Sequence, residues 1–330
     1  MSRFSVLLLA SDERGLAEHA LPAALAAGPD EALVVDNGSR DGVAELAARH
    51  GVECLRLARR VPYTHAMNAG LRRVSGEAVA LLQADTFVGA GYRAVTEAAL
   101  ADPAVGAVAP RLVRALGPAP AQRLEELDAA GMSLDRRRKN GLVGHGRPAA
   151  DFATPSEVFG ADGAAAVYRR AALEDCALPG GQYLDEEMPG WGCDADLAWR
   201  ARLRGWRAVY APDAVVHHVR TYSPTTRDRM SEADRRVQFR NRYLMMVKND
   251  SAADLLRDAP RILGYEALAL GHALLRERHL LRAYGEAWRR LPAARRRRRA
   301  VQAGRRVRRV PFGLEAPQGT AGPREPAAPA

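Results

Sequence analysis

The run Gly76-Glu-Ala-Val-Ala-Leu-Leu-Gln-Ala-Asp-Thr86 has the composition of a strand buried on both faces, because small and branched apolar side chains follow one another without alternation. It ends in one carboxylate, Asp85, with no residue of opposite charge beside it in the sequence. In an open α/β sheet, ligands bind just beyond the carboxyl ends of the strands. We therefore interpret Asp85 as the centre of a ligand site.

The chain before and after this run alternates between strand and helix patterns with short connections. Strands are expected at 4–10, 31–36, 52–57, 76–84 and 105–109, and helices at 13–27, 43–50, 63–75 and 91–101. This alternation predicts an α/β fold with a mostly parallel, right-handed, Rossmann-like sheet. Residues 114–155 are rich in Gly, Pro and Arg and are interpreted as an inserted surface excursion.

Apolar patterns typical of strands and helices reappear in the second half of the chain. We expect a strand at 163–168, an acidic and aromatic loop at 183–192, a helix at 194–204, short strands at 206–210 and 214–218, and helices from 231 onward. This organisation predicts a domain over 1–250, divided into halves at 1–112 and 113–250, then a basic helical extension at 251–310. Residues 311–330, with many Pro, Gly and Ala, are expected to be disordered.

Composition indicates a folded protein of 330 residues, 47% of them apolar and 27% charged. No window of ~18 uncharged apolar residues exists, so we expect no transmembrane helix. The start of the chain runs straight into a strand pattern, which argues against a signal peptide. Three cysteines lie far apart without a Cys-x-x-Cys pair, which fits reduced thiols in the cytoplasm and disfavours zinc.

The positive charge is confined to one end of the chain. Residues 1–250 contain 32 basic and 32 acidic residues, whereas residues 251–330 contain 17 basic and 7 acidic residues. A cationic arm of this kind can bind nucleic acid, an anionic membrane surface or an acidic partner. The neutral part has no basic stripe with interleaved aromatic residues, so we expect no nucleic-acid partner.

Two strand ends carry candidate ligand-binding carboxylates. Asp36 ends the run Val34-Val35-Asp36 and precedes Asn-Gly-Ser-Arg-Asp-Gly, so it is placed either to accept hydrogen bonds from a nucleotide or to end a strand in a plain turn. The dinucleotide fingerprint Gly-x-Gly-x-x-Gly is absent. Asp85 suits Mg²⁺ or Mn²⁺ if the ligand is a diphosphate, because phosphate oxygens and water complete the coordination of such ions.

Further candidates follow the 183–192 loop. On a helix, Asp194 shares a side with Leu197 and is expected to point inward, as a general base or as a plain helix cap. Asp196 lies nearly opposite and is expected at the surface, paired with Arg200 at i+4. His217 ends a strand that could lie beside Asp85 and is a candidate metal ligand.

Taken in order, these motifs resemble a family 2 glycosyltransferase of the GT-A fold, in its rhamnosyltransferase-like branch, over residues 3–250. The motifs are Val-Val-Asp-Asn-Gly-Ser-x-Asp-Gly from Val34, Asn68-x-Gly70 before Gly76-Glu77, the Asp85 strand, Gly160-x-x-Gly163 before Arg169-Arg170, Asp194-x-Asp196-Leu197 followed by Arg200 and Gly205-Trp206, then Pro212, His217 and Arg240-Asn241-Arg242-Tyr243.

The resemblance implies inverting transfer of a sugar from a nucleotide-sugar to a hydroxyl of a glycan or lipid-linked acceptor, in synthesis of a cell-surface polysaccharide. It implies donor binding by Ser11, Asp36, Asn68 and Asp85, a metal ion at Asp85, acceptor deprotonation by Asp194, and acceptor contacts by Trp191 and Asp196. The family's usual Asp-x-Asp reads Gln83-Ala84-Asp85 here, and Leu9-Ala-Ser-Asp12 and Cys193 also depart from its pattern. Gln83 leaves open a protein that binds or scaffolds without catalysis.

Two interpretations remain for the basic extension. Residues 262–275 are too short and too polar to span a bilayer, but together with residues 276–309 they suit a helix in the membrane interface. The arginine run at 295–299 would then face anionic headgroups. The other interpretation is a solvated helix packed on the preceding domain. The membrane interpretation predicts a cytoplasmic protein bound peripherally to the inner face of the cell membrane.

Overall fold

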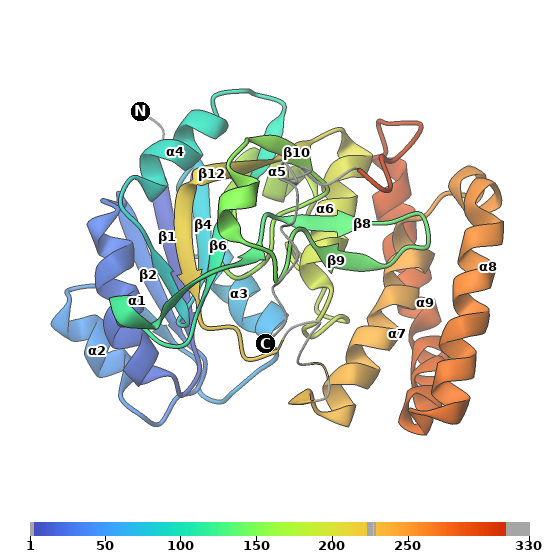
Figure 1. Cartoon of the computed structure of the whole chain (residues 1–330), viewed down its shortest axis with the longest axis horizontal. Coiled ribbons are helices and arrows are strands. Elements are labelled where there is room, and N and C mark those ends of the chain that lie inside the picture. The colour runs from blue at the N-terminus through green and yellow to red at the C-terminus, as the bar shows by residue number, and fades with distance from the viewer. Residues whose placement is uncertain (1–2, 223–226, 228, 315–330) are drawn as a thin grey trace, which may run out of the picture.

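The computed structural model describes residues 3–222, 227 and 229–314, and places a central sheet between helices with three long helices at one end (Figure 1). The strands are β1 (Phe4–Ala10), β2 (Glu31–Asp36), β3 (Glu53–Arg56), β4 (Ala78–Gln83), β5 (Thr86–Val88), β6 (Val105–Ala115), β7 (Arg123–Ala129), β8 (Met132–Leu134), β9 (Asn140–Leu142), β10 (Ser156–Val158), β11 (Val167–Arg169) and β12 (Arg207–His218). The α-helices are α1 (Arg14–Ala26), α2 (Val43–Arg49), α3 (Tyr63–Leu71), α4 (Tyr92–Ala99), α5 (Arg170–Asp175), α6 (Cys193–Arg204), α7 (Glu232–Asn249), α8 (Ala252–Leu275) and α9 (Leu281–Ala303).

The large sheet has the strand order β10-β12-β6-β11-β4-β1-β2-β3, with β5 paired to β12 and β7 paired to β6. Strands β3, β2, β1 and β4 are mutually parallel neighbours, and β6 is parallel to β12. Strand β11 runs antiparallel between β4 and β6. The predicted α/β fold is therefore confirmed, but the expectation of a mostly parallel sheet is wrong. Among the described strands of this sheet, four pairs are parallel and five are antiparallel, because β5, β7, β10 and β11 run against their neighbours.

The continuous apolar sequence of β1 reflects a core on each face of the sheet. Phe4, Val6 and Leu8 pack into a cluster with residues of α1 and α2, while Leu7 and Leu9 pack into a second cluster with residues of α3 and α6. Successive side chains of a strand point to opposite faces, so a strand covered on both sides needs apolar residues at every position.

The C-terminal helices form a further layer against α6. A third apolar cluster joins α6, α7 and α9 around Trp199, which is fully buried. Two of these helices have a serine N-cap. The hydroxyl of Ser231 accepts a hydrogen bond from Asp234 N at the start of α7, and the hydroxyl of Ser251 accepts one from Asp254 N at the start of α8. Helix α8 lies outermost at this end of the molecule (Figure 1).

The interpretation of residues 114–155 as a surface excursion is wrong. Strand β7 pairs with β6 in the large sheet, and both Asp128 and Arg138 are fully buried. Arg138 is neutralised by Asp250 and Asp258, at 2.7 and 2.9 Å, more than a hundred residues further along the chain. Charged residues can be buried when they are paired, so local polarity was a misleading guide to exposure here.

Two further sequence interpretations need correction. The strands expected at 206–210 and 214–218 are one strand, β12, with an irregular register between Ala211 and Val215. Residues 315–330 of the stretch expected to be disordered lie outside the described residues. The residues before them pack on the domain, since the ring of Phe312 meets Trp199 edge-on at 5.1 Å between centroids.

Within the described residues, no helix combines the length and apolar character needed to cross a bilayer.

Candidate active site

The carboxyl ends of three neighbouring strands form one polar edge of the sheet. Register places Ala10 opposite Asp36 and Leu9 opposite Gln83, so β2, β1 and β4 end side by side. The residues just beyond these ends are Ser11, Asn37 and Asp85. The predicted convergence of Ser11, Asp36 and Asp85 at one edge follows from this parallel register.

Asp85 has one carboxylate oxygen that is free for a ligand. Its Oδ1 is buried and receives no hydrogen bond from any described residue. Its Oδ2 lies 3.4 Å from Nε2 of His218, at the end of β12. A buried polar atom without a partner is costly unless something binds to it.

His218 belongs to a buried chain of charged groups. Its Nδ1 lies 2.8 Å from Oδ2 of Asp128, which also accepts a hydrogen bond from Arg220 Nε at 2.7 Å. Burial alone would lower the pKa of His218, but Asp85 and Asp128 outweigh it and raise the pKa to about 9. Burial opposes ionisation of Asp128, yet the hydrogen-bonding partners hold the pKa of its carboxyl well below its usual range. Arg220 extends the chain to Asp162 at 2.8 Å.

The predicted metal ligand His217 is the wrong one of two adjacent histidines. In the pairing of β12 with β5, His218 lies opposite Thr86 and His217 opposite Phe87. Neighbouring strand residues point to opposite faces, so only His218 reaches Asp85. His217 lies on the other face, where burial and the charge of Arg123 lower its pKa to about 4.

Hydrogen bonds through the backbone of Gly163 link Asp194 to the same edge of the sheet. It is the second residue of α6, and its Oδ1 and Oδ2 accept hydrogen bonds from Ala195 N at 2.8 Å and Gly163 N at 3.3 Å. The carbonyl oxygen of Gly163 in turn accepts a hydrogen bond from Gln83 Nε2 at 3.4 Å, at the end of β4. Burial and the charge of Asp162 raise the pKa of Asp194 to about 6.

Asp36 and Ser11 line the part of this edge that lies toward β2 and β3. Asp36 is buried, and its Oδ1 accepts a hydrogen bond from Ser39 N at 2.8 Å. Its Oδ2 accepts no hydrogen bond from the described residues, although Arg56 Nε lies 3.4 Å away. The hydroxyl of Ser11 is likewise buried without a described partner. Both side chains therefore keep hydrogen-bonding capacity at the predicted nucleotide site.

The family model described as Glycosyl transferase family 2 matches residues 13–177, which is half of the chain. The chain belongs to glycosyltransferase family 2. A pre-mycofactocin glycosyltransferase from Mycobacterium tuberculosis is 33% identical over 190 residues, covering 56% of this chain and 37% of that protein. The matched region is therefore little more than a third of the length of this relative.

Solved glycosyltransferases share the fold. The structure of S. aureus TarS 1-349 in complex with UDP-GlcNAc aligns with a TM-score of 0.57 at 14% identity, over 91% of this chain and 90% of that one. The mannosyltransferase PcManGT from Pyrobaculum calidifontis, in complex with GDP-Man and Mn²⁺, aligns with a TM-score of 0.50 at 20% identity, over 92% and 87% of the two chains. These neighbours establish the GT-A fold that the sequence motifs predicted.

In this family 2 chain, Asp196 is not at the surface and has no free atom to offer an acceptor. It is fully buried, and its carboxylate is bound by Arg200 Nε at 3.0 Å, Lys248 Nζ at 2.8 Å and Asn249 Nδ2 at 2.8 Å. The predicted pair with Arg200 exists, but α7 covers it. The prediction of an exposed, acceptor-binding Asp196 is therefore wrong.

Asn68 holds the 183–192 loop in place. Its Oδ1 accepts hydrogen bonds from Tyr183 N and Leu184 N at 3.1 and 2.9 Å, and its Nδ2 donates to Leu184 O at 2.8 Å. Asn68 is fully buried, so its polar atoms are engaged by this loop. The structure thus gives Asn68 a positioning role where the resemblance implied direct contact with the donor.

The far side of the 183–192 loop is held by the C-terminal helices. Asp185 is bound by Lys248 of α7 and by Arg297 Nε of α9 at 3.1 Å. Trp191 donates from its indole nitrogen to Asp234 Oδ1 at 3.3 Å, and its carbonyl accepts from Asn241 Nδ2 at 2.8 Å. Trp191 remains partly exposed, beside Tyr222 at 6.3 Å between ring centroids.

Sequence reasoning missed two charged residues of this site. Arg60 donates to the carbonyl of Ser11 at 2.6 Å and to Asp12 Oδ2 at 3.1 Å, so a mostly exposed guanidinium lies over the end of β1. Glu13 stands close enough for burial and the charge of Asp85 to raise its pKa. The Arg59-Arg60 pair shortly after β3 was the available signal, whereas Glu13 looked like an ordinary first-turn residue.

Proposed function

We propose that this chain transfers a sugar, with inversion, from a nucleotide-diphosphate sugar to a hydroxyl acceptor. One observation carries the proposal. Asp85, with a buried carboxylate oxygen that has no partner among the described residues, follows the strand whose last residue, Gln83, is joined through Gly163 to Asp194, and the pKa of Asp194 is raised. Membership of glycosyltransferase family 2 supports it. So do fold neighbours solved with UDP-GlcNAc and with GDP-Man.

The donor would lie along the ends of β2, β1 and β4. Asp36 and Ser11 have unused acceptor and hydroxyl groups for the nucleoside, and Arg60 adds a guanidinium able to pair with phosphate oxygens. Asp85 and His218 would hold a divalent cation, with the ion replacing the proton that His218 carries at neutral pH, and the charge of the ion would offset that of the departing diphosphate.

The donor atoms at this position fit such an ion. Across the described residues, no three His, Cys, Asp or Glu side chains form a complete metal site, so phosphate oxygens and water would supply the remaining ligands. A carboxylate oxygen beside an imidazole nitrogen favours Mn²⁺ over Mg²⁺, which takes oxygen ligands. The fold neighbour PcManGT is solved with Mn²⁺, which agrees with this preference.

Asp194 would act as the general base. Its carboxylate takes the proton of the acceptor hydroxyl while the acceptor oxygen bonds to the anomeric carbon from the side opposite the diphosphate. The bond between the anomeric carbon and the diphosphate oxygen breaks, and the nucleoside diphosphate departs with that electron pair. The raised pKa of about 6 suits a base that works near neutral pH.

The acceptor would be a glycan or a lipid-linked sugar seated on the 183–192 loop. Trp191 presents a partly exposed indole there, and aromatic faces pack well on the apolar side of a sugar ring. We place this reaction in cell-surface glycan synthesis and in the cytoplasm. The unpaired state of all three cysteines agrees with a reducing compartment.

Kinetics of Asp194→Asn test the proposal. We expect turnover to fall by about 10²–10⁴-fold with donor affinity unchanged, because the variant keeps the side chain's shape but loses the base, together with one of the two backbone hydrogen bonds that the carboxylate accepts. Asp213→Asn makes the same chemical change at an exposed position of β12 and should leave turnover unchanged. Near-normal turnover of Asp194→Asn would contradict the assigned role.

The donor can be identified by thermal shift. Nucleoside diphosphates and nucleotide-sugars are screened with Mn²⁺, and the correct nucleotide raises the unfolding temperature because it binds only the folded state. The competing idea of a non-catalytic scaffold, prompted by Gln83, predicts donor binding without transfer or donor hydrolysis by the wild-type chain. Manganese-dependent hydrolysis that is lost in Asp85→Ala would exclude that idea.

A further inference from the structure

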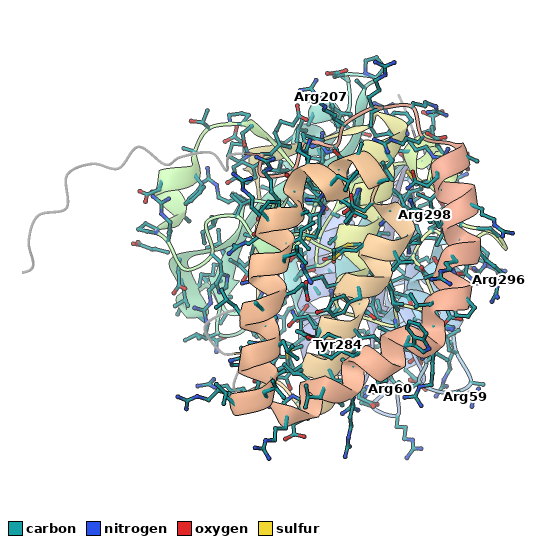
Figure 2. The ribbon with its side chains drawn as sticks, turned by 90° about the vertical axis from the view of Figure 1, so that its right-hand side faces the viewer. Arg59, Arg60, Arg207, Tyr284, Arg296 and Arg298 are labelled. Atoms are coloured by element: carbon teal, nitrogen blue, oxygen red, sulfur yellow. The ribbon has the colours of Figure 1, made fainter. Side chains whose placement is uncertain are left out.

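Helix α8 presents a row of exposed leucines to solvent. Six of its leucines are between 43% and 83% exposed: Leu256, Leu263, Leu268, Leu270, Leu274 and Leu275. Single exposed leucines are common on protein surfaces, but a contiguous apolar patch marks an interaction site. Figure 2 looks onto this end of the molecule, where α8 and α9 lie in front.

Helical spacing gathers four of these leucines on one side of α8. Leu256, Leu263, Leu270 and Leu274 are separated by seven, seven and four residues, which brings them to the same face. The exposed residues that complete this face are small or apolar: Ala252, Ala253, Pro260, Gly264 and Ala267. The opposite side of the helix carries its buried residues Asp254, Asp258, Ile262 and Ala273. We call the exposed side the leucine face.

The acidic residues of this region are directed into the protein and neutralised. Segment 251–310 contains five acidic residues, and each forms an ion pair with arginine. Asp254 and Asp258 are buried beneath α8, where Asp258 also pairs with Arg136 and Arg138. Glu266 of α8 is partly exposed but is paired with Arg242, so α8 presents no unpaired acid to repel an anionic partner.

Unlike the paired acidic residues, three arginines of the segment from α8 to the start of α9 are exposed. Arg261, Arg276 and Arg282 are exposed, and none of them forms an ion pair with a described acidic residue. Trp288 of α9 is 73% exposed as well. Exposed leucines on α8, together with exposed arginines and an exposed indole on α8, α9 and the turn between them, are the composition of a segment that lies in a membrane interface.

We propose that the leucine face docks on an anionic phospholipid membrane, with α8 lying in the plane of the interface. The leucines would enter the boundary between headgroups and acyl chains, and Arg261, Arg276 and Arg282 would meet the phosphates. A second copy of the chain is a poorer occupant, because a symmetric contact through this face would bring the arginines of both copies together. The proposal is independent of the proposed transfer reaction.

The arginine run at 295–299 contributes less than its sequence implies. Arg297 binds Asp185, and Arg298 donates to the carbonyls of Val247 and Asp250 at 2.8 and 2.7 Å. Helix α9 thus packs on the domain, and only Arg295, Arg296 and Arg299 of the run are exposed. Figure 2 labels Arg296 and Arg298 on this helix. The two interpretations of the extension therefore apply to different helices: α9 is packed on the domain, and α8 is the membrane element.

Vesicle flotation tests the proposal with the full chain. We expect binding to vesicles of phosphatidylcholine mixed with phosphatidylglycerol, and weak binding to phosphatidylcholine alone. Leu263→Gln combined with Leu274→Gln should weaken binding at least about tenfold, since burial of two leucines is lost. The matched control is Leu116→Gln, an equally exposed leucine (68%) outside the C-terminal helices, which should bind like wild type.

Charge variants separate the electrostatic contribution. Arg261→Gln and Arg276→Gln should each weaken binding about fivefold at low salt, and Arg261→Lys should restore it. Unchanged binding in the leucine double variant, or no binding of wild type to anionic vesicles, would overturn the proposal. So would light scattering that finds a dimer which the leucine double variant dissociates. Turnover on a soluble acceptor should be unaffected by the leucine changes, which keeps this test separate from that of the transfer reaction.

Discussion

Two groups of carboxylates in this molecule differ in what binds them. At the sheet edge, the buried Asp36 and the partly buried Asp85 each keep an oxygen without a described hydrogen-bond partner. Beneath α7, Asp185 and Asp196 are bound by Lys248, and Asp196 is also bound by Arg200 and Asn249. Asp36 is as buried as Asp185 and Asp196, so burial alone does not mark a ligand site. The ligand site is marked by the carboxylate oxygens at the sheet edge that receive no hydrogen bond from the described residues.

The largest effect is expected where the carboxylates are fully paired. Lys248→Met removes the cation shared by Asp185 and Asp196, so each buried carboxylate loses one of its two cationic partners and keeps only Arg297 or Arg200. The free energy of unfolding should fall by about 3–5 kcal/mol, measured by urea denaturation. Asp85→Asn at the sheet edge is the comparison and should cost far less, because Asp85 Oδ1 has no hydrogen-bond partner among the described residues and Oδ2 lies 3.4 Å from His218. Equal losses in the two variants would erase the distinction between the groups.

A second effect separates the adjacent histidines of β12. His218→Gln should weaken Mn²⁺ binding in the presence of a nucleoside diphosphate by at least about 10–100-fold, the loss usual even for outer partners of a metal site. His217→Gln removes the same side chain from the opposite face and should leave Mn²⁺ affinity unchanged. Titration calorimetry measures both. A larger loss for His217→Gln would restore the original sequence interpretation.

The smallest effect concerns pH. Asp194 must be ionised to act as a base, and burial and Asp162 raise its pKa to about 6 from an ordinary value of 3.8. Turnover should therefore rise about tenfold per unit as pH increases toward 6, and level off above it. A pH profile of kcat measures this, and Asp194→Asn should lose the rising limb. A wild-type profile that is flat through this range would contradict the assignment.

Stability should respond to the same group with the opposite sign. The folded state holds the proton of Asp194 more tightly than the unfolded chain, so between about pH 4 and 6 the folded state binds more protons. The contribution of Asp194 to stability is therefore present below this window and is lost as pH rises through it. Asp194 at the sheet edge therefore lowers the stability of the fold near neutral pH. Burial opposes ionisation of Asp185 beneath α7, but Lys248 outweighs burial and lowers the pKa of Asp185, which therefore raises the stability there.

The sequence predicted the first half of the fold well for a physical reason. Strands Phe4–Ala10 and Glu31–Asp36 were bounded correctly, because a parallel strand covered on both faces must be apolar throughout and ends at a polar turn. Asp36 and Asp85 were located by the rule that ligands bind at the carboxyl ends of such strands. Local pattern was sufficient for these residues.

The second half depended on partners distant in sequence. A helical wheel assumes one buried side, but α6 is covered by the sheet core and by α7, so Asp196 was assigned to the surface by a rule that does not hold there. The irregular register of β12 between Ala211 and Val215 hid which of His217 and His218 faces Asp85. Asp128 lies 90 residues from His218, a pairing that no local pattern reports.

The most direct test of the account is a crystal structure of the chain with its nucleoside diphosphate and Mn²⁺, located by anomalous scattering from manganese. If Asp85 holds the metal and Asp194 is the base, we expect an anomalous peak about 2.1 Å from Asp85 Oδ1, close to the diphosphate. The Asp194 carboxylate should then face the position of the transferred sugar. Manganese and nucleotide bound away from Asp85, or Asp194 directed away from the nucleotide, would contradict it.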